Sequence, residues 1–160
     1  MPNKEYRASI RLDVLGLSLA GLINTFLALL VAVIVVGPGT VAGQPDLLQR
    51  AAWIAENTLR WQAGWLFWFA VTLSFSWSFY ALGRHLNAER PWAALAIGVA
   101  LIAAAVDIAG VLVNMTILPE LAQSLANTGD PSLHVVFQSM ENFANALTNV
   151  TAFGLYTAAG

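Results

Sequence analysis

The sequence lacks cysteine altogether and carries few charged residues. Only 10 % of its 160 residues are Asp, Glu, Lys or Arg, whereas a soluble domain carries about 25 %. So little charge cannot cover a water-facing surface, which excludes a soluble globule. The absence of cysteine excludes disulfides, thiol catalysis, zinc knuckles and Cys-ligated iron–sulfur clusters.

An excess of basic residues is also missing. Seven Lys and Arg stand against nine Asp and Glu, so no basic patch indicates a nucleic acid as partner. The sequence contains no HExxH motif and no Glu-x-x-His pair of the di-iron type. We therefore expect no metal and no cofactor, and no motif indicates an enzyme.

What the sequence does contain is long apolar runs. A bilayer core of ~30 Å needs ~20 apolar residues in a helix, and 58 % of this chain is hydrophobic. The runs predict an all-α fold, a polytopic transmembrane helical bundle that forms a single domain over residues 1–160. We place four spans near residues 14–36, 61–82, 92–118 and 132–160.

Glycine and proline mark the expected ends of the spans. The first span is expected to stop at Gly37-Pro38-Gly39, and the third at Pro119 with a loop reaching Pro131. The first run is too long for the core of a signal peptide, so we favour an anchor over a cleaved signal. The fourth span lacks a polar ending at Gly160, which suggests that the chain is a fragment of a longer protein.

The connection before the second span leaves two alternatives open. Asp46 is suited to begin a helix, and residues 46–60 mix apolar with polar side chains. This pattern is typical of a helix that lies in the membrane interface. It equally suits the first turns of the second span, and in both cases residues 46–59 should be helical.

The basic residues predict the orientation in the membrane. They stand at the N-terminus (Lys4, Arg7 and Arg11) and between the second and third spans (Arg84 and Arg90). The positive-inside rule then places both segments in the cytoplasm. We expect a multi-pass protein of a bacterial inner membrane with a cytoplasmic N-terminus.

Asp107 lies near the middle of the third span, where a charge costs at least ~2.5–3.5 kcal/mol. It shares a helix face with small residues and with Asn114, and small residues let another helix approach closely. The functional interpretation is a proton or cation site. The structural alternative is a hydrogen-bonded Asp between packed helices.

A polar stripe follows one face of the fourth span, which is too polar to face lipid. Its members are Gln138, Glu141, Asn142, Asn145, Thr148 and Asn149. Asn24 and Thr25 of the first span could complete the same interior. We expect no Lys or Arg at the depth of Asp107 and Glu141, hence no ion pair, and we expect Asp107 to bond to Asn142, Asn145 or Glu141.

The second span is rich in aromatic residues. Trp61, Trp65 and Trp68 form a row at helical spacing, which is typical of an aromatic belt at the membrane interface. The alternative is a contact surface for a carotenoid, a quinone or another flat lipid or pigment.

Part of the chain resembles a known family. The resemblance is carried by Ile54-Ala55-Glu56, Leu59 to Gly64, Phe79-Tyr80-Ala81-Leu82 and Trp92-Ala93-Ala94-Leu95. These residues resemble a family of bacterial six-helix integral membrane proteins of unknown function. The family shows a Leu-Tyr-like pair where this chain has Phe79-Tyr80. The resemblance, over about half of the chain, implies a fifth and a sixth helix and supplies no functional residues.

Three functions follow as hypotheses. The first is an accessory or structural subunit of a larger membrane complex, since the fourth span needs partners such as other transmembrane subunits or further copies of the chain. The second is a proton- or cation-coupled small transporter that uses Asp107 and Glu141. The third is binding of a lipid, carotenoid or quinone on the aromatic second span. Membrane lipids are expected partners in all three.

Overall fold

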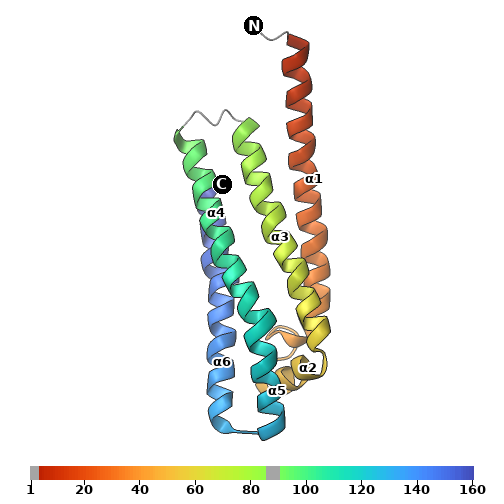
Figure 1. Ribbon diagram of the computed structural model, residues 1–160, viewed down its shortest axis with the longest axis vertical. Helices are drawn as coiled ribbons and strands as arrows, with labels where there is room; N and C mark the ends of the chain where they lie inside the picture. The colour runs from red at the N-terminus through yellow and green to blue at the C-terminus, as the bar shows by residue number, and fades with distance from the viewer. Residues whose placement is uncertain (1–3, 86–90) are drawn as a thin grey trace.

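The computed structural model describes residues 4–85 and 91–160 of the chain, which are helical with short connections and contain no strand within those ranges. The elements in chain order are α1 (Lys4–Val36), η1 (Gly37–Gly39), α2 (Leu47–Glu56), α3 (Thr58–His85), α4 (Pro91–Leu112), η2 (Val113–Ile117), α5 (Leu118–Thr128), α6 (Pro131–Asn145), η3 (Ala146–Ala152) and α7 (Phe153–Ala159). Long helices run side by side along one axis (Figure 1). The predicted all-α helical bundle is confirmed.

Three helical segments of the described chain are long and apolar enough to cross a membrane. They are Gly21–Gly39, Thr58–Gly83 and Pro91–Thr128. They match the first three predicted spans approximately. The fourth, 132–160, is helical almost throughout as α6, η3 and α7, but it is not among the three because of its polar side chains. We refer to α6, η3 and α7 together as the fourth helix.

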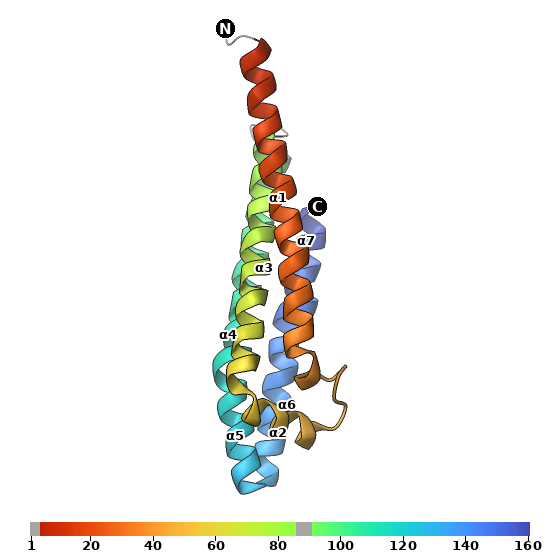
Figure 2. The same ribbon diagram turned by 90° about the vertical axis from the view of Figure 1, so that its right-hand side faces the viewer.

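The predicted helix after Asp46 is confirmed. The Asp46 carboxylate accepts a hydrogen bond from Gln49 N at 2.8 Å and so caps α2. Asn57 ends α2, and α3 begins at the next residue. The buried face of α2 packs against α5, and Figure 2 shows α2 beside the ends of α1 and α3. We call this end of the bundle, formed by α2, α5 and the turn at residues 129–130, the capped end.

The predicted loop from Pro119 to Pro131 is wrong. The helix continues through η2 and α5 to Thr128, where Gly129 ends it with a φ of 64°. The resulting segment, Pro91–Thr128, has 38 residues, which corresponds to ~57 Å and exceeds the ~30 Å of a bilayer core. The α5–α6 hairpin therefore projects beyond the ends of α1 and α3 (Figure 1).

Pro119 fails to stop the helix because α3 replaces the hydrogen bonds that it removes. Pro119 has no N–H, so the carbonyls four and five residues earlier, those of Met115 and Asn114, lose it as a donor. The π-helical turn η2 lies at this point. Trp61 Nε1 donates to the Asn114 carbonyl oxygen at 2.6 Å, and Gln62 Nε2 donates to that of Met115 at 2.9 Å.

α4 and the fourth helix pack closely along the predicted face of small residues. Ala100, Ala103, Asp107 and Gly110 of α4 and Asn114 of η2 are all buried. A Cβ placed on Gly110 would lie 2.6 Å from Thr148 Cγ2 and 3.0 Å from the Ala144 carbonyl oxygen. Glycine at this position thus permits the contact between the two helices, as the sequence predicts.

The two sides of the bundle are packed unequally. α1 packs along most of α3, whereas it makes few contacts with the fourth helix. A buried apolar cluster near the capped end joins α2, α3, η2 and α5 through Ile54, Trp61, Trp65 and Leu118, among others. Of the two cavities described below, one lies between α1 and the fourth helix, and the other lies between the fourth helix and the loop that follows η1.

Candidate functional site

The carboxylate of Asp107 accepts its hydrogen bonds from side chains of α3. The side chain is 5 % exposed, and its two carboxylate oxygens accept separate hydrogen bonds. Trp68 Nε1 donates to Oδ1 at 3.2 Å, and Thr72 Oγ1 donates to Oδ2 at 2.5 Å. α3 therefore orients the carboxylate with two donors one helical turn apart.

The partners expected for Asp107 are wrong. Its hydrogen bonds come from α3, not from Asn142, Asn145 or Glu141 of the fourth helix. The two helices are indeed neighbours, but Asn142, Asn145 and Glu141 line a different cavity from the one that Asp107 lines. Trp68 and Thr72 of α3 donate the hydrogen bonds to Asp107 instead.

Asp107 lies on the wall of a cavity of about 370 Å³. We call this space the Asp107 cavity. Its walls come from α1, α3, α4 and the fourth helix, and most of them are apolar or aromatic. Its lining residues are Thr25, Leu29, Trp68, Val71, Thr72, Phe75, Asp107, Thr148, Asn149, Phe153 and Tyr156.

A second cavity of about 500 Å³ lies toward the capped end. Four carboxamide side chains line it, those of Asn114, Asn142, Asn145 and Asn149, and we call it the asparagine cavity. Thr148 and Asn149 line both cavities. The two spaces are thus adjacent, with a hydroxyl and a carboxamide at their boundary.

The asparagine cavity explains most of the polar stripe. Asn142, Asn145 and Asn149 line it, and Asn149 Nδ2 donates to Asn145 Oδ1 at 2.7 Å. Gln138, one turn closer to the α5–α6 turn, is exposed and does not line this cavity. The stripe thus lines a cavity, although Asn142, Asn145 and Asn149 keep exposed side chains.

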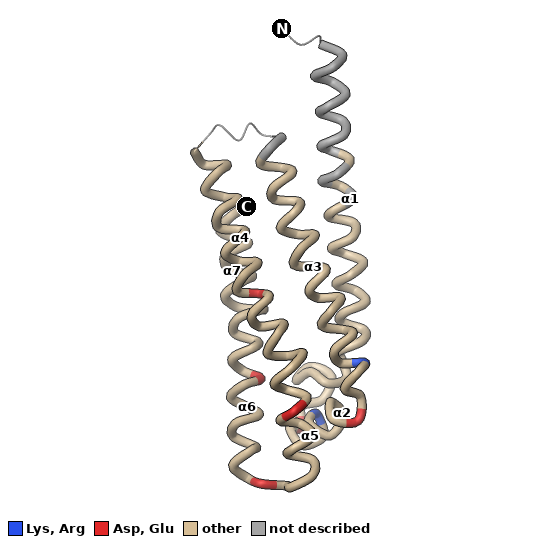
Figure 3. The backbone as a smooth tube through the Cα atoms, in the orientation of Figure 1, with Lys and Arg blue, Asp and Glu red and all other residues tan. Residues whose placement is uncertain are grey.

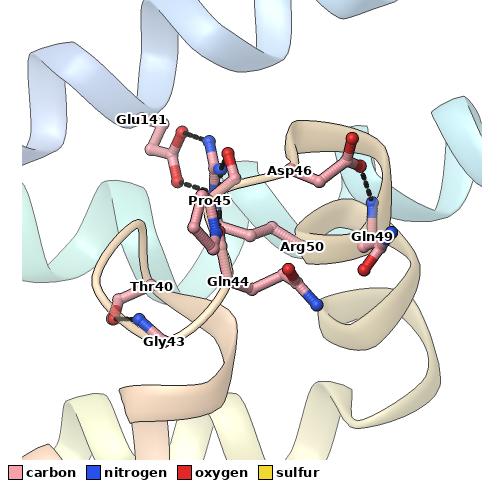
Figure 4. A network of polar contacts seen from close by, with 8 residues as sticks. All are labelled: Thr40, Gly43, Gln44, Pro45, Asp46, Gln49, Arg50 and Glu141. Atoms are coloured by element: carbon pink, nitrogen blue, oxygen red, sulfur yellow. Dashed lines mark hydrogen bonds and ion pairs between the residues drawn. The ribbon is translucent and has the colours of Figure 1, made fainter.

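Glu141 forms a buried ion pair with Arg50 of α2, so the expectation that no cation reaches it is wrong. Arg50 Nε and Nη2 donate to the two carboxylate oxygens at 2.8 and 2.6 Å. Arg50 Nη1 donates to the carbonyl oxygens of Gln44 and Pro45 at 3.0 and 2.7 Å. Figure 4 shows the guanidinium between Glu141 and the chain that leads into α2.

The expected depth of Glu141 explains this error. The depth of Glu141 in the membrane was counted along the sequence from the end of the apolar run. The α5–α6 hairpin, however, projects beyond the other helices. Glu141 consequently lines the same cavity as Trp61 and Leu118, close to the start of α3, where α2 can reach it. Among the residues that Figure 3 colours, the acidic and basic positions lie mostly toward this capped end.

Asn24 does not join the polar stripe. Its carboxamide donates to Ser74 Oγ of α3, and the residue is exposed. Its neighbour Thr25 lines the Asp107 cavity instead. The first helix thus contributes a hydroxyl to the site, and Asn24 holds α1 to α3.

The tryptophan row faces the protein interior. Trp61 and Trp65 are 3 % and 6 % exposed, with their ring centroids 5.6 Å apart. These two indoles are therefore not a lipid-facing belt. Both line the asparagine cavity, and Trp68 lines the Asp107 cavity, so contact of the row with a bound ligand stays a prediction.

Two residues of the site were missed in the sequence. Arg50 lies on the buried face of α2 with Ala51 and Ile54, a helical spacing that signals burial of the charge. Thr72 follows Trp65 and Trp68 at seven and four residues, which places it on the same face. In the described residues, no group of three or more His, Asp or Glu side chains could hold a metal ion.

No family model, curated relative or solved structure matches this chain.

Proposed function

We propose that this protein is a small membrane carrier that couples transport to a proton or cation held at Asp107. One observation carries the proposal: a carboxylate with two fixed donors lines a cavity that adjoins a second, polar cavity. Intramembrane carboxyls that face a cavity are typical of ion and proton pathways. Glu141 is neutralised by Arg50, so the proposal uses Asp107 alone.

The polar groups supply a route between the cavities and the carboxylate. From the capped end, Asn142 and Asn145 lead to Asn149 and Thr148 at the boundary. Beyond Asp107, Ser76 Oγ lies 3.4 Å from the Tyr156 hydroxyl, and Tyr156 lines the same cavity. A proton would transfer from one of these groups to the next, and a small cation would be coordinated by them in turn.

Two π-helical turns border the route. η2 contains Asn114 and η3 contains Thr148 and Asn149. π-helical turns interrupt the regular hydrogen-bond ladder and often occur at functional sites. We infer that a change of register at these turns alters the width of the boundary between the cavities.

The orientation belongs to the same proposal. The basic residues at the N-terminus favour the cytoplasmic side for the start of α1 and the outer side for the capped end of a bacterial inner membrane. Asn127 is exposed at the capped end, whereas Asn87 lies outside the described residues. An impermeant thiol reagent should label Asn127→Cys and not Asn87→Cys in intact cells, and the opposite labelling would invert the topology.

Reconstitution of the purified protein alone tests the carrier. Vesicles that contain only this chain should show protein-dependent movement of protons or cations across the membrane when a potential or a pH gradient is imposed. Vesicles with the protein that are no more permeable than empty ones would contradict the proposal.

An accessory subunit is the second candidate. The few contacts between α1 and the fourth helix favour it, because a helix of another subunit or of a second copy could fill that space. Such a protein would co-purify in mild detergent with a larger assembly at fixed stoichiometry, and it would show no transport on its own.

A further inference from the structure

We propose that the Asp107 cavity binds a lipophilic organic cation, such as an amine or phosphonium with bulky apolar substituents. This inference rests on the proposed carrier function and names the class of its substrate. It follows from three properties of the cavity: its charge, its walls and its opening.

The carboxyl group that lines the cavity has no cationic partner among the described residues. Within the described chain, no Lys or Arg lies within ion-pair distance of Asp107, while Glu141 is paired with Arg50. The groups that bond Asp107, Trp68 N–H and Thr72 O–H, are neutral donors. A carboxylate in an apolar setting is costly without a partner, and a bound cation would provide that partner.

Part of the cavity wall is aromatic. Four rings line it, those of Trp68, Phe75, Phe153 and Tyr156. Phe75 and Tyr156 hold each other in a T-shaped contact with centroids 4.8 Å apart. Cations bind to the faces of such rings, especially when both partners are shielded from water. One carboxylate among several rings is the chemistry that recognises organic cations rather than hydrated metal ions.

The size and opening of the cavity fit a ligand that arrives through the membrane. About 370 Å³ falls within the ~300–1,000 Å³ that is usual for small-molecule sites. The cavity lies between α1 and the fourth helix, which make few contacts. Phe153 lines the cavity and is still 69 % exposed, so this ring lies at its mouth, and a ligand could enter there from the side of the bundle.

The test uses two ions of matched shape and opposite charge, tetraphenylphosphonium and tetraphenylborate. Binding of each to the full-length protein in detergent is measured by equilibrium dialysis. We expect the phosphonium to bind with at least ~10-fold higher affinity than the borate, because a single carboxylate sets the sign of the site. The Asp107→Asn variant should lose at least ~10-fold in affinity for the phosphonium.

Two further variants keep the test informative if Asp107→Asn folds poorly. Phe153→Ala changes an exposed ring and should weaken phosphonium binding roughly 3- to 30-fold. Asp130→Asn removes a carboxylate from the α5–α6 turn and should leave binding unchanged. Equal binding of the two ions to the wild-type protein, or no binding of either, overturns the proposal.

The result of the phosphonium-binding test can be distinguished from the result of the flux test of the carrier. If vesicles show flux that depends on Asp107 while the phosphonium does not bind, the substrate class is wrong and the carrier stands. If the phosphonium binds with the expected charge preference and vesicles show no flux of any ion, the site is supported and the carrier is overturned.

Discussion

Arg50 and Glu141, which are 91 residues apart in the chain, form a two-point ion pair that fastens α2 to the fourth helix. The guanidinium is 4 % exposed and the carboxylate 14 %. The same guanidinium also bonds two backbone carbonyls at the start of α2. These contacts therefore hold α2 and the residues just before it against α6.

We expect Arg50→Ala to destabilise the protein strongly. The substitution leaves the Glu141 carboxylate largely buried without its cation, which costs about 3 kcal/mol. Thermal unfolding in detergent, followed by tryptophan fluorescence, measures the change. Arg60→Ala is the control, because Arg60 is exposed and lies over Trp53 at 5.5 Å, a contact worth about 0.5–1 kcal/mol. Equal losses in the two variants would contradict the role given to Arg50.

The close approach of α4 and the fourth helix predicts opposite effects at two glycines of α4. Gly110→Ala should destabilise the protein by about 1–3 kcal/mol, since the new Cβ would meet Thr148 and the Ala144 backbone. Gly98→Ala should stabilise it by about 0.5–1 kcal/mol, because nothing lies within 4 Å of the new Cβ and alanine favours the helix. Denaturation midpoints of the two variants test this, and a shift in the same direction would refute the packing.

The link between Pro119 and α3 predicts coupled mutations. Trp61→Phe removes the donor to the Asn114 carbonyl and should cost about 1–2 kcal/mol beyond the loss of packing. In a Pro119→Ala background, the restored backbone N–H offers that region a replacement donor. We therefore expect the cost of Trp61→Phe to fall by about 0.5–1 kcal/mol in a double-mutant cycle. Strict additivity would argue against the link.

Asp130 predicts a pH dependence of stability. It caps α6, and hydrogen bonds from the Ser132 backbone N–H and hydroxyl hold the pKa of Asp130 below its usual value. A carboxyl whose folded-state pKa is lowered stabilises the fold above its unfolded pKa, and this contribution is lost as the pH falls through the folded value. The stability advantage of wild type over Asp130→Asn should accordingly shrink as the pH falls below about 5. An advantage that does not vary with pH would contradict the shift.

The fold could be predicted where the signal is local. Apolar runs predicted the long helices, Gly37-Pro38-Gly39 predicted the end of α1, and Asp46 predicted the start of α2. Pro119 misled because its effect depends on donors from Trp61 and Gln62, which are distant in the sequence. No local pattern reveals that another helix supplies those bonds.

The candidate site was predicted only in part, because its residues can also be recognised only where the signal is local. Asp107 and the asparagines of the fourth helix stand out as polar residues in apolar surroundings, and they do line adjacent cavities. The expected partner of Asp107 was wrong because nothing in the sequence around Thr72 indicates that its hydroxyl faces α4. The Arg50–Glu141 pair was missed because depth counted along the sequence ignores how far the α5–α6 hairpin projects.

Proton flux into vesicles that contain only this protein tests the central claim, that Asp107 is the working carboxyl of a membrane carrier. A pH-sensitive dye trapped inside the vesicles reports the flux under an imposed potential for wild type, Asp107→Asn and Asp130→Asn. The account predicts that Asp107→Asn lowers the rate at least ~10-fold while Asp130→Asn keeps the wild-type rate. Equal rates for wild type and Asp107→Asn, with both proteins folded and inserted, would contradict it.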